Sequence, residues 1–166
     1  MKDLIVYYSL EGNTEYAADR IKDKLGADTL CLVPKKAYSN KGASKFIWGG
    51  KSALMKEKPE LEAYEVDLSS YDRIIFGFPV WASTFTPPIR TFINDNRDKI
   101  AGKKFAAFAC QAGNGADKAL AKLAQYLEVA SFEKTAVFID PKLRRCDKTD
   151  SGIDDFASSL AASDGD

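Results

Sequence analysis

Six consecutive residues near the start of the chain combine the groups that hold a phosphate. They follow residues 2–8, whose β-branched and aromatic side chains are typical of a buried strand, and precede residues 15–25, whose apolar positions share one helical face. A turn from strand to helix presents unpaired backbone N–H groups at the positive end of the helix dipole, and both favour an anion. Hydroxyl and amide side chains add donors, and glycine allows close approach. The six residues are Ser9, Leu10, Glu11, Gly12, Asn13 and Thr14.

Two later loops carry groups that suit a flat heterocyclic ring. Each follows a predicted apolar strand, over residues 73–78 in one case and 104–109 in the other. The indole of Trp81 in the first loop offers a large face for stacking. In the second, glycines flank Asn114, so backbone N–H and C=O groups can lie flat against a polar ring edge. The loops consist of Pro79, Val80, Trp81, Ala82, Ser83 and Thr84, and of Cys110, Gln111, Ala112, Gly113, Asn114 and Gly115.

An alternation of strands and helices predicts how these loops are positioned. It indicates an α/β fold of three layers, with a five-stranded parallel sheet and helices on both faces. Ligands of such sheets bind beyond the carboxyl ends of the strands. We therefore expect the three loops to form one site. The predicted strands are residues 2–8, 28–33, 73–78, 104–109 and 132–139, and the predicted helices include residues 15–25 and 116–127.

Capping signals predict where two further helices begin. Thr86 followed by Pro87 is typical of a helix start, with a hydroxyl N-cap and proline at the first position. Ser151 with Asp154 resembles a capping box for a last helix that runs to residue 160. The long crossover over residues 35–71 contains an amphipathic stretch at 43–55, interpreted as a helix bent near its two glycines that covers the sheet or forms a lid.

Composition limits the classes of protein that remain. The 166 residues fit one domain over residues 1–162, with a frayed tail at 163–166. No apolar run approaches the roughly 20 residues that span a bilayer, and the chain begins directly with a strand, so we expect neither membrane insertion nor a signal peptide. The 24 basic and 24 acidic residues cancel, which does not favour nucleic acid. Three widely spaced cysteines without a metal or disulfide pattern indicate a reducing cytoplasm: Cys31, Cys110 and Cys146.

Other doubly wound proteins fit the loops poorly. The first loop matches neither the P-loop of nucleotide triphosphatases nor the glycine pattern of dinucleotide-binding domains. A receiver-type signalling domain needs an aspartate where the chain has Phe78 and Pro79. The chain contains no histidine, which excludes an imidazole base or a His-ligated metal. Cys110 is interpreted as a small core residue at a turn rather than a redox group, because neither histidine nor a second cysteine accompanies it.

The order of the three loops resembles the flavodoxin family over essentially the whole chain. The family's phosphate loop is commonly Ser/Thr-x-Ser/Thr-Gly-Asn/Thr-Thr, and here Glu11 replaces the middle hydroxyl. The resemblance implies noncovalent FMN, strand order 2-1-3-4-5, phosphate on residues 9–14, and the isoalloxazine between the Trp81 loop and the Cys110 loop. Many flavodoxins carry a tyrosine in the third loop, and this chain has none. The resemblance therefore implies a more open flavin, unless Trp81, Phe85 or Trp48 covers it.

Two functions of different class follow from this resemblance. In the first, the protein carries electrons between redox partner proteins through a bound flavin. In the second, it is an FMN-dependent reductase that takes hydride from a nicotinamide nucleotide and passes it to a quinone. Neither requires a catalytic side chain, because the flavin performs the chemistry. A flavin-free interaction module is a remote third alternative.

Overall fold

The computed structural model describes residues 1–39, 51, 53 and 55–163. Its sheet has five parallel strands in the order β2-β1-β3-β4-β5, as predicted. The strands are β1 (Asp3–Tyr7), β2 (Asp28–Cys31), β3 (Arg73–Pro79), β4 (Lys104–Gln111) and β5 (Thr135–Ile139). The helices described are α1 (Asn13–Leu25), α3 (Pro87–Ile100), α4 (Ala116–Leu127) and α5 (Asp147–Ala162), with a short 3-10 helix, η1 (Leu68–Ser70).

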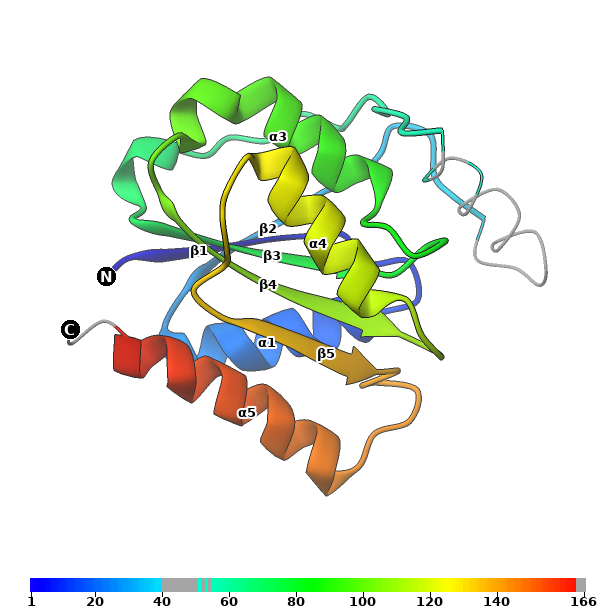
Figure 1. Cartoon of the computed structure of the whole chain (residues 1–166), viewed down its shortest axis with the longest axis vertical. Coiled ribbons are helices and arrows are strands. Elements are labelled where there is room, and N and C mark those ends of the chain that lie inside the picture. Colours follow the sequence, from blue (N-terminus) through cyan, green and yellow to red (C-terminus); the bar gives the residue numbers. More distant parts are fainter. Residues whose placement is uncertain (40–50, 52, 54, 164–166) are drawn as a thin grey trace.

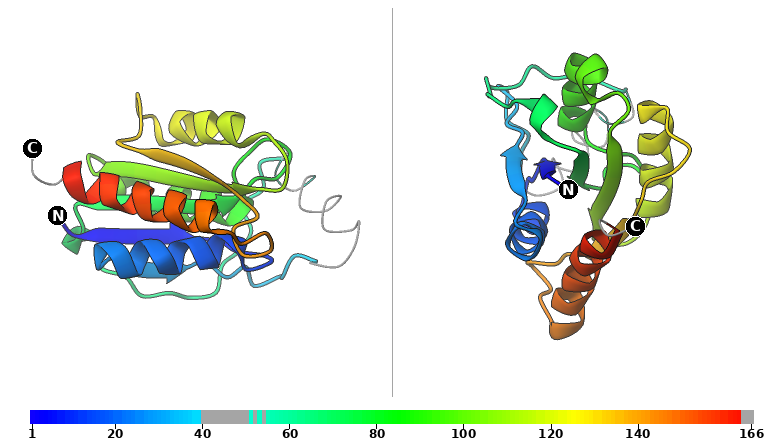
Figure 2. Two further views of the ribbon diagram at one scale, coloured as in Figure 1. Left: turned by 90° about the horizontal axis from the view of Figure 1, so that it is seen from below. Right: turned by 90° about the vertical axis from the view of Figure 1, so that its left-hand side faces the viewer.

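Helices cover both faces of the sheet, so the fold has three layers (Figures 1 and 2). Successive residues of a strand point to opposite faces. Leu4 and Val6 of β1 therefore pack with α3 and α4, whereas Ile5 packs with α1 and α5. The central strands are buried on both sides, as their continuous apolar sequence predicts. This packing confirms the predicted α/β class.

The two edges of the sheet differ in what they carry. Because the strands are parallel, the loops after β1, β3, β4 and β5 emerge at one edge, here called the carboxyl edge. The start of β1 and the end of α5 lie at the opposite, amino edge (Figure 1). The predicted site residues are therefore gathered at the edge that is remote from these two ends.

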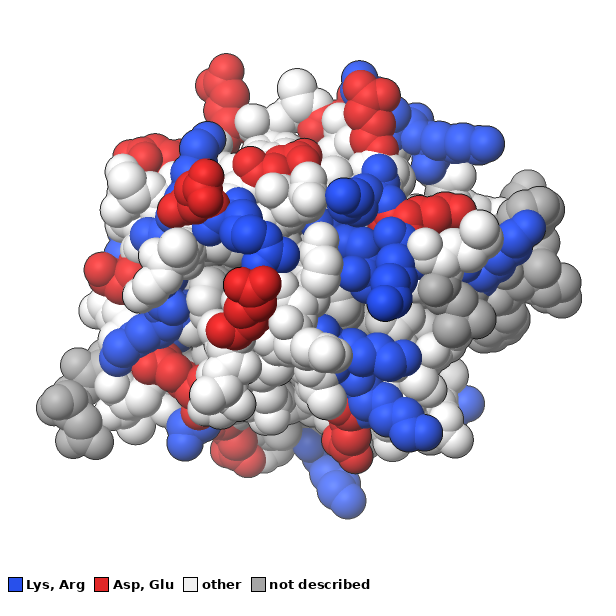
Figure 3. Space-filling view, turned by 45° about the horizontal axis from the view of Figure 1, so that its top comes forward, with Lys and Arg blue, Asp and Glu red and all other residues white. Residues whose placement is uncertain are grey.

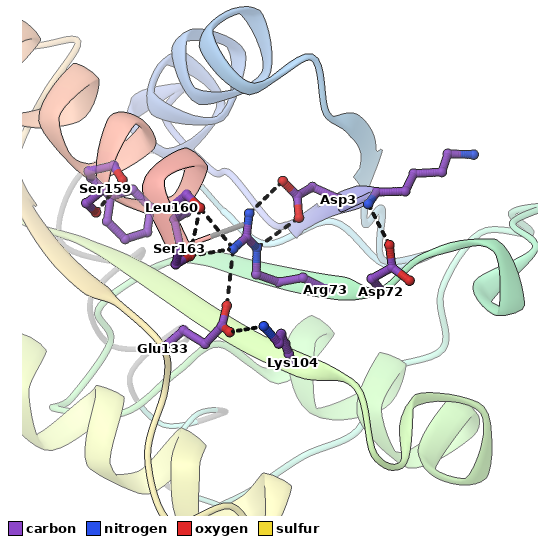
Figure 4. A network of polar contacts seen from close by, with 10 residues as sticks. Asp3, Asp72, Arg73, Lys104, Glu133, Ser159, Leu160 and Ser163 are labelled. Carbon is purple, nitrogen blue, oxygen red and sulfur yellow. Dashed lines mark hydrogen bonds and ion pairs between the residues drawn. The ribbon is translucent and has the colours of Figure 1, made fainter. Parts of the chain in front are cut away.

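The amino edge is closed by a network of polar contacts around Arg73, which is wholly buried (Figure 4). Its guanidinium donates two hydrogen bonds of 2.8 Å to the carboxylate of Asp3 and one of 3.1 Å to Glu133. It also donates to the Leu160 carbonyl and to the Ser163 hydroxyl of the C-terminal end. A buried charge is tolerated when such partners neutralise it. Ser163, assigned to the frayed tail by sequence, is held by these bonds, and residues 164–166 lie outside the described part.

Two predicted element boundaries are wrong by three residues or more. The last helix begins at Asp147, so Ser151 lies inside α5 and forms no capping box. Asp154 instead accepts two hydrogen bonds from Arg20 of α1, at 2.8 and 2.9 Å. Strand β5 begins at Thr135 rather than at residue 132, where the strand was predicted to start. A tertiary ion pair between α1 and α5 thus uses the carboxylate that sequence assigned to a local cap.

The segment between β3 and α3 also differs from expectation. Thr86 is the N-cap of α3 and Pro87 is its first residue, as predicted, but the Thr86 hydroxyl does not cap the helix. It is buried without a hydrogen-bond partner in the described chain. Phe85, which the resemblance named as one residue that could cover the flavin, is 1 % exposed and belongs to the core under α3 and α4. Phe85 therefore does not cover the site.

The crossover between β2 and β3 returns along the edge of β2. Pro34 pairs with Leu61 in an isolated antiparallel bridge, and the Lys35 ammonium contacts the Glu60 carboxylate. The helix predicted over residues 43–55, including Trp48, falls largely outside the described residues.

Candidate cofactor-binding site

The three loops singled out from the sequence meet at the carboxyl edge. They surround one cavity of about 120 Å³, because β1, β3 and β4 are neighbours in the sheet. The cavity is lined by Ser9, Leu10, Glu11, Asn13, Thr14, Pro79, Val80, Trp81, Ala82, Cys110, Gln111 and Ala112, with Asp140 after β5. The remaining singled-out residues lie in the same loops but outside this lining: Gly12, Ser83, Thr84, Gly113, Asn114 and Gly115.

The first loop leaves backbone donors at the start of α1. Gly12 is the N-cap, with a φ of 91°, and no side chain caps the helix there. Ser9 accepts a hydrogen bond of 3.2 Å from the Glu15 N–H. The N–H groups of Asn13 and Thr14 have no acceptor within the helix and none elsewhere in the described residues. These two donors and the helix dipole favour an anion at this position.

The loop after β5 supports the first loop, and sequence reasoning missed it. Asn13 accepts hydrogen bonds from the backbone N–H groups of Lys142 (2.9 Å) and Leu143 (3.1 Å). Its amide donates to Asp140 at 3.4 Å. The Lys142 ammonium lies against Gly12: a Cβ placed on that glycine would sit 2.7 Å from Nζ. The helix start therefore has a cation beside it, and more than 120 residues separate the two loops in sequence.

The second loop is a tight turn closed by paired backbone hydrogen bonds. Trp81 and Thr84 exchange N–H···O bonds of 3.2 and 3.0 Å. Ala82 and Ser83 between them both have positive φ, at 50° and 55°, as a type I′ turn requires. The turn fixes Trp81 at the mouth of the cavity and directs Thr84 to the other side.

The Trp81 indole belongs to a cluster of aromatic rings. Its centroid is 5.6 Å from that of Tyr8 and 5.0 Å from that of Tyr38, both in edge-to-face geometry. Tyr38 comes from the segment after β2, and no sequence pattern predicted that it would lie here. Burial raises the pKa of the Tyr8 hydroxyl, which keeps the phenol neutral. The cluster orients Trp81, so the aromatic wall comes from the second loop and its neighbours and not from the third.

The third loop is attached to the second at the start of α4. Gly115 is the N-cap of α4, with a φ of 100°. A Cβ there would lie 2.7 Å from the Ser83 hydroxyl, so only glycine allows the two loops to approach this closely. Gln111 accepts a 2.9 Å hydrogen bond from the Ala116 N–H and so satisfies one donor of the helix. Gly113 and Asn114 are exposed beyond the cavity.

Cys110 is a structural thiol, as predicted. It is 3 % exposed, and burial raises the pKa of its thiol to about 12, which a hydrogen bond with Thr14 offsets only in part. The thiol is therefore protonated at neutral pH and is a poor nucleophile. Among the described residues, no three His, Cys, Asp or Glu side chains are grouped to hold a metal ion. In the same part of the chain no helix has the length and apolar character to cross a bilayer.

Comparisons with known proteins agree with the fold. A solved flavoprotein from Lactobacillus acidophilus NCFM, in complex with FMN, superposes with a TM-score of 0.73 at 21 % identity, covering 94 % of this chain and 98 % of that one. The two-electron reduced flavodoxin of Megasphaera elsdenii gives 0.61 at 19 % identity, covering 96 % and 98 %. No curated protein sequence matches the chain. The sequence profile described as flavodoxin matches residues 2–145, and the chain therefore belongs to the flavodoxin family.

Proposed function

We propose that this chain binds FMN noncovalently at the cavity of the three loops and carries electrons between redox partner proteins in the cytoplasm. Membership of the flavodoxin family supports FMN as the cofactor. The structurally similar Lactobacillus acidophilus protein was solved in complex with FMN. The three cysteines of this chain are free thiols, which suits a reducing compartment.

The observation that carries the proposal is the uncapped start of α1. A cofactor phosphate there would accept hydrogen bonds from the N–H groups of Asn13 and Thr14, which the described chain leaves without acceptors. The Lys142 ammonium beside Gly12 would neutralise part of its charge. Glu11 is exposed at the cavity, and Lys142 offsets the repulsion that this carboxylate would exert on an anion. The residues present therefore fit a phosphate.

The end of the cavity away from α1 suits the isoalloxazine ring system of FMN. Trp81, held edge-on by Tyr8 and Tyr38, offers an aromatic wall beside the backbone of Cys110 and Ala112. When bound, FMN supplies one- and two-electron transfer. The chain binds and orients the cofactor, and the buried Cys110 thiol stays out of the chemistry because it is protonated.

A reductase is the second candidate, and the exposure of the third loop favours it. Ala112, Gly113 and Asn114 are all exposed, and no aromatic side chain extends from this loop. Small exposed residues at that position would leave room for a nicotinamide or a quinone beside a bound flavin. The alternative shares the FMN cavity with the carrier and differs in its electron donor.

The first experiment measures the affinity for FMN and for riboflavin, which lacks the phosphate. Quenching of flavin fluorescence on titration gives both dissociation constants. We expect FMN to bind at least about tenfold more tightly than riboflavin, since only FMN can use the charged contacts at α1. Lys142→Ala should reduce this preference by about 3- to 10-fold, whereas Lys148→Ala, an exposed lysine of α5, should leave it unchanged. Absence of FMN binding would contradict the proposal.

The second experiment separates the carrier from the reductase. The FMN-loaded protein is photoreduced while its visible spectrum is recorded, and its oxidation of NADPH and NADH with a quinone is measured separately. A stable one-electron-reduced state without pyridine nucleotide oxidation supports the carrier. Rapid turnover of NADPH or NADH with quinone supports the reductase and overturns the carrier.

A further inference from the structure

A second cavity lies on the opposite side of the Trp81–Thr84 turn. Its volume is about 480 Å³, and it opens between the start of α3 and the middle of α4. Figure 3 shows this face of the molecule, where Lys and Arg side chains gather over the part toward the carboxyl edge. The cavity is lined chiefly by Lys56, Thr84, Arg90, Lys122, Gln125 and Tyr126.

Arg90 is the unusual member of this lining. Its side chain is 7 % exposed, and its guanidinium carbon lies 4.4 Å from the ring centroid of Phe85 and 4.5 Å from that of Tyr126. No carboxylate of the described residues forms an ion pair with it. Residues 40–50, 52 and 54, which the structure does not describe, contain no Asp or Glu. Arg90 is thus a buried cation that the aromatic rings stabilise without neutralising it.

Such an arrangement is costly unless an anion completes it. Burial lowers the pKa of Arg90, yet a guanidinium remains charged in proteins. A buried charge without a counter-ion destabilises the folded chain. Two further cations, Lys56 and Lys122, face the same cavity, and Thr84 and Gln125 add polar groups. Among the described residues, the lining has three positive charges and no carboxylate.

We propose that this cavity is a second anion site, which takes a phosphate group in contact with Arg90 and Lys122. A phosphate dianion matches a site with several cations, and a guanidinium can bind two of its oxygens at once. The Trp81–Thr84 turn joins the two cavities: Trp81 lines the first and Thr84 lines the second. An occupant of the second cavity would therefore restrain the turn that positions Trp81.

The phosphate could be free in solution or part of a nucleotide, and titrations distinguish the two sources. Calorimetry uses FMN-saturated protein in about 0.15 M KCl, which screens exposed charges; protein that takes up no FMN is titrated as purified. The probes are inorganic phosphate, NADP⁺ and NAD⁺. NADP⁺ binding at least about tenfold tighter than phosphate and NAD⁺ identifies a nucleotide phosphate, whereas similar binding of phosphate and NADP⁺ identifies the free ion. Absence of binding by all three up to about 10 mM overturns the proposal.

Matched variants test whether binding occurs at the proposed place. Lys122→Ala should weaken binding of the tightest probe by about 5-fold or more, and Arg90→Gln by about 10-fold or more. Lys118→Ala, an exposed lysine one turn earlier on α4, should change it less than about twofold. Equal losses in the Lys118 and Lys122 variants would overturn the site, because they indicate general surface charge. If Arg90→Gln fails to fold, the Lys122→Ala variant, which changes an exposed residue, still tests whether the anion binds at this site.

The same set of variants shows which of the two cavities binds the anion. Lys142→Ala alters the first cavity and should leave phosphate binding at the second unchanged. Loss of phosphate binding in Lys142→Ala with retention in Lys122→Ala would place the anion at α1 and overturn the proposal. Failure of FMN to bind, by contrast, would overturn the proposed function and leave the result at Arg90 and Lys122 intact.

Discussion

Arg73 and Arg90 are both buried, but their surroundings are opposite. Arg73 lies at the amino edge and donates to the carboxylates of Asp3 and Glu133 and to two further oxygens near the C-terminal end. Arg90 lies near the carboxyl edge, against the rings of Phe85 and Tyr126 and beside a cavity. One guanidinium is neutralised within the fold, and the other is exposed only to a space that a ligand could fill.

This difference indicates that the amino edge serves mainly the stability of the fold and the carboxyl edge mainly the binding of ligands. The amino edge satisfies its charges and joins β1, β3 and α5, so it holds the sheet together. Within the part of the chain that the structure describes, the carboxyl edge leaves donors without acceptors at the start of α1 and a cation without a carboxylate at α3. Unsatisfied groups weaken the folded state unless a ligand satisfies them. We therefore expect substitutions at the amino edge to affect mainly stability, and those at the carboxyl edge mainly affinity.

The largest effect is expected from Arg73→Met. This variant removes the cation and leaves the buried Asp3 carboxylate unpaired, which should lower the free energy of unfolding by about 3–5 kcal/mol. Urea unfolding followed by circular dichroism measures the loss. Arg144→Met removes an ion pair from an arginine side chain that is 66 % exposed and should cost less than about 1 kcal/mol. Equal losses in the two variants would contradict the role of the network.

Asn13→Ala tests a part-buried polar junction of the carboxyl edge that is satisfied within the described chain. It leaves the N–H groups of Lys142 and Leu143 without their acceptor, which should cost about 1–2 kcal/mol of stability. We also expect a several-fold loss of FMN affinity, because the Lys142 backbone is no longer held against α1. Asn114→Ala, at an exposed position of the third loop, serves as the control in the stability measurement. An unchanged unfolding midpoint in Asn13→Ala would refute this junction.

Glu133→Gln tests how much one charged side chain of the amino edge contributes to the stability of the folded chain. Partial burial raises the pKa of Glu133, but hydrogen bonds from Lys104 and Arg73 outweigh it and hold the pKa below the ordinary glutamate value. A lowered folded-state pKa stabilises the protein above the pKa of the unfolded chain, and the stabilisation is lost as pH falls toward the folded value. The variant should lose about 0.5–1 kcal/mol at neutral pH.

The acid limb of the stability curve provides the readout for Glu133. Urea midpoints measured from neutral pH to about pH 3 should fall less steeply in Glu133→Gln than in the unsubstituted chain, since one titrating carboxylate is absent. Glu65→Gln, at an exposed position, should reproduce the curve of the unsubstituted chain. Parallel acid limbs in all three proteins would rule out a lowered pKa at Glu133.

The smallest change in stability is expected from Arg90→Met. The variant loses the contacts of the guanidinium with two aromatic rings but also removes an unneutralised buried charge, and the two effects oppose each other. The free energy of unfolding should change by less than about 1 kcal/mol. A loss as large as that of Arg73→Met would show that Arg90 is a structural residue and would remove the contrast between the two arginines.

Much of the fold followed from local patterns. Apolar runs and helical spacing predicted the strands, their parallel arrangement and the helices on both faces, because burial on two sides demands continuous apolar sequence. The ends of elements were less well predicted. Asp154 serves a tertiary ion pair with Arg20 instead of a cap, and Phe85 is drawn into the core by α4. The intrinsic preference of a short segment for helix or strand takes no account of tertiary contacts that compete with local caps and turns.

The sequence by itself determined which loops emerge at the carboxyl edge, because the alternation of strands and helices implies a parallel sheet and the chemistry of each loop is encoded in a few residues. The strand order was implied by the family resemblance. The tertiary structure alone decided which distant groups join them. Lys142 lies against Gly12 and Tyr38 packs against Trp81. Arg90 has no carboxylate partner among the residues that the structure describes. The physical reason is that charge neutralisation and ring packing depend on separations in space. Residues more than 100 positions apart carry no periodic signal of their contact.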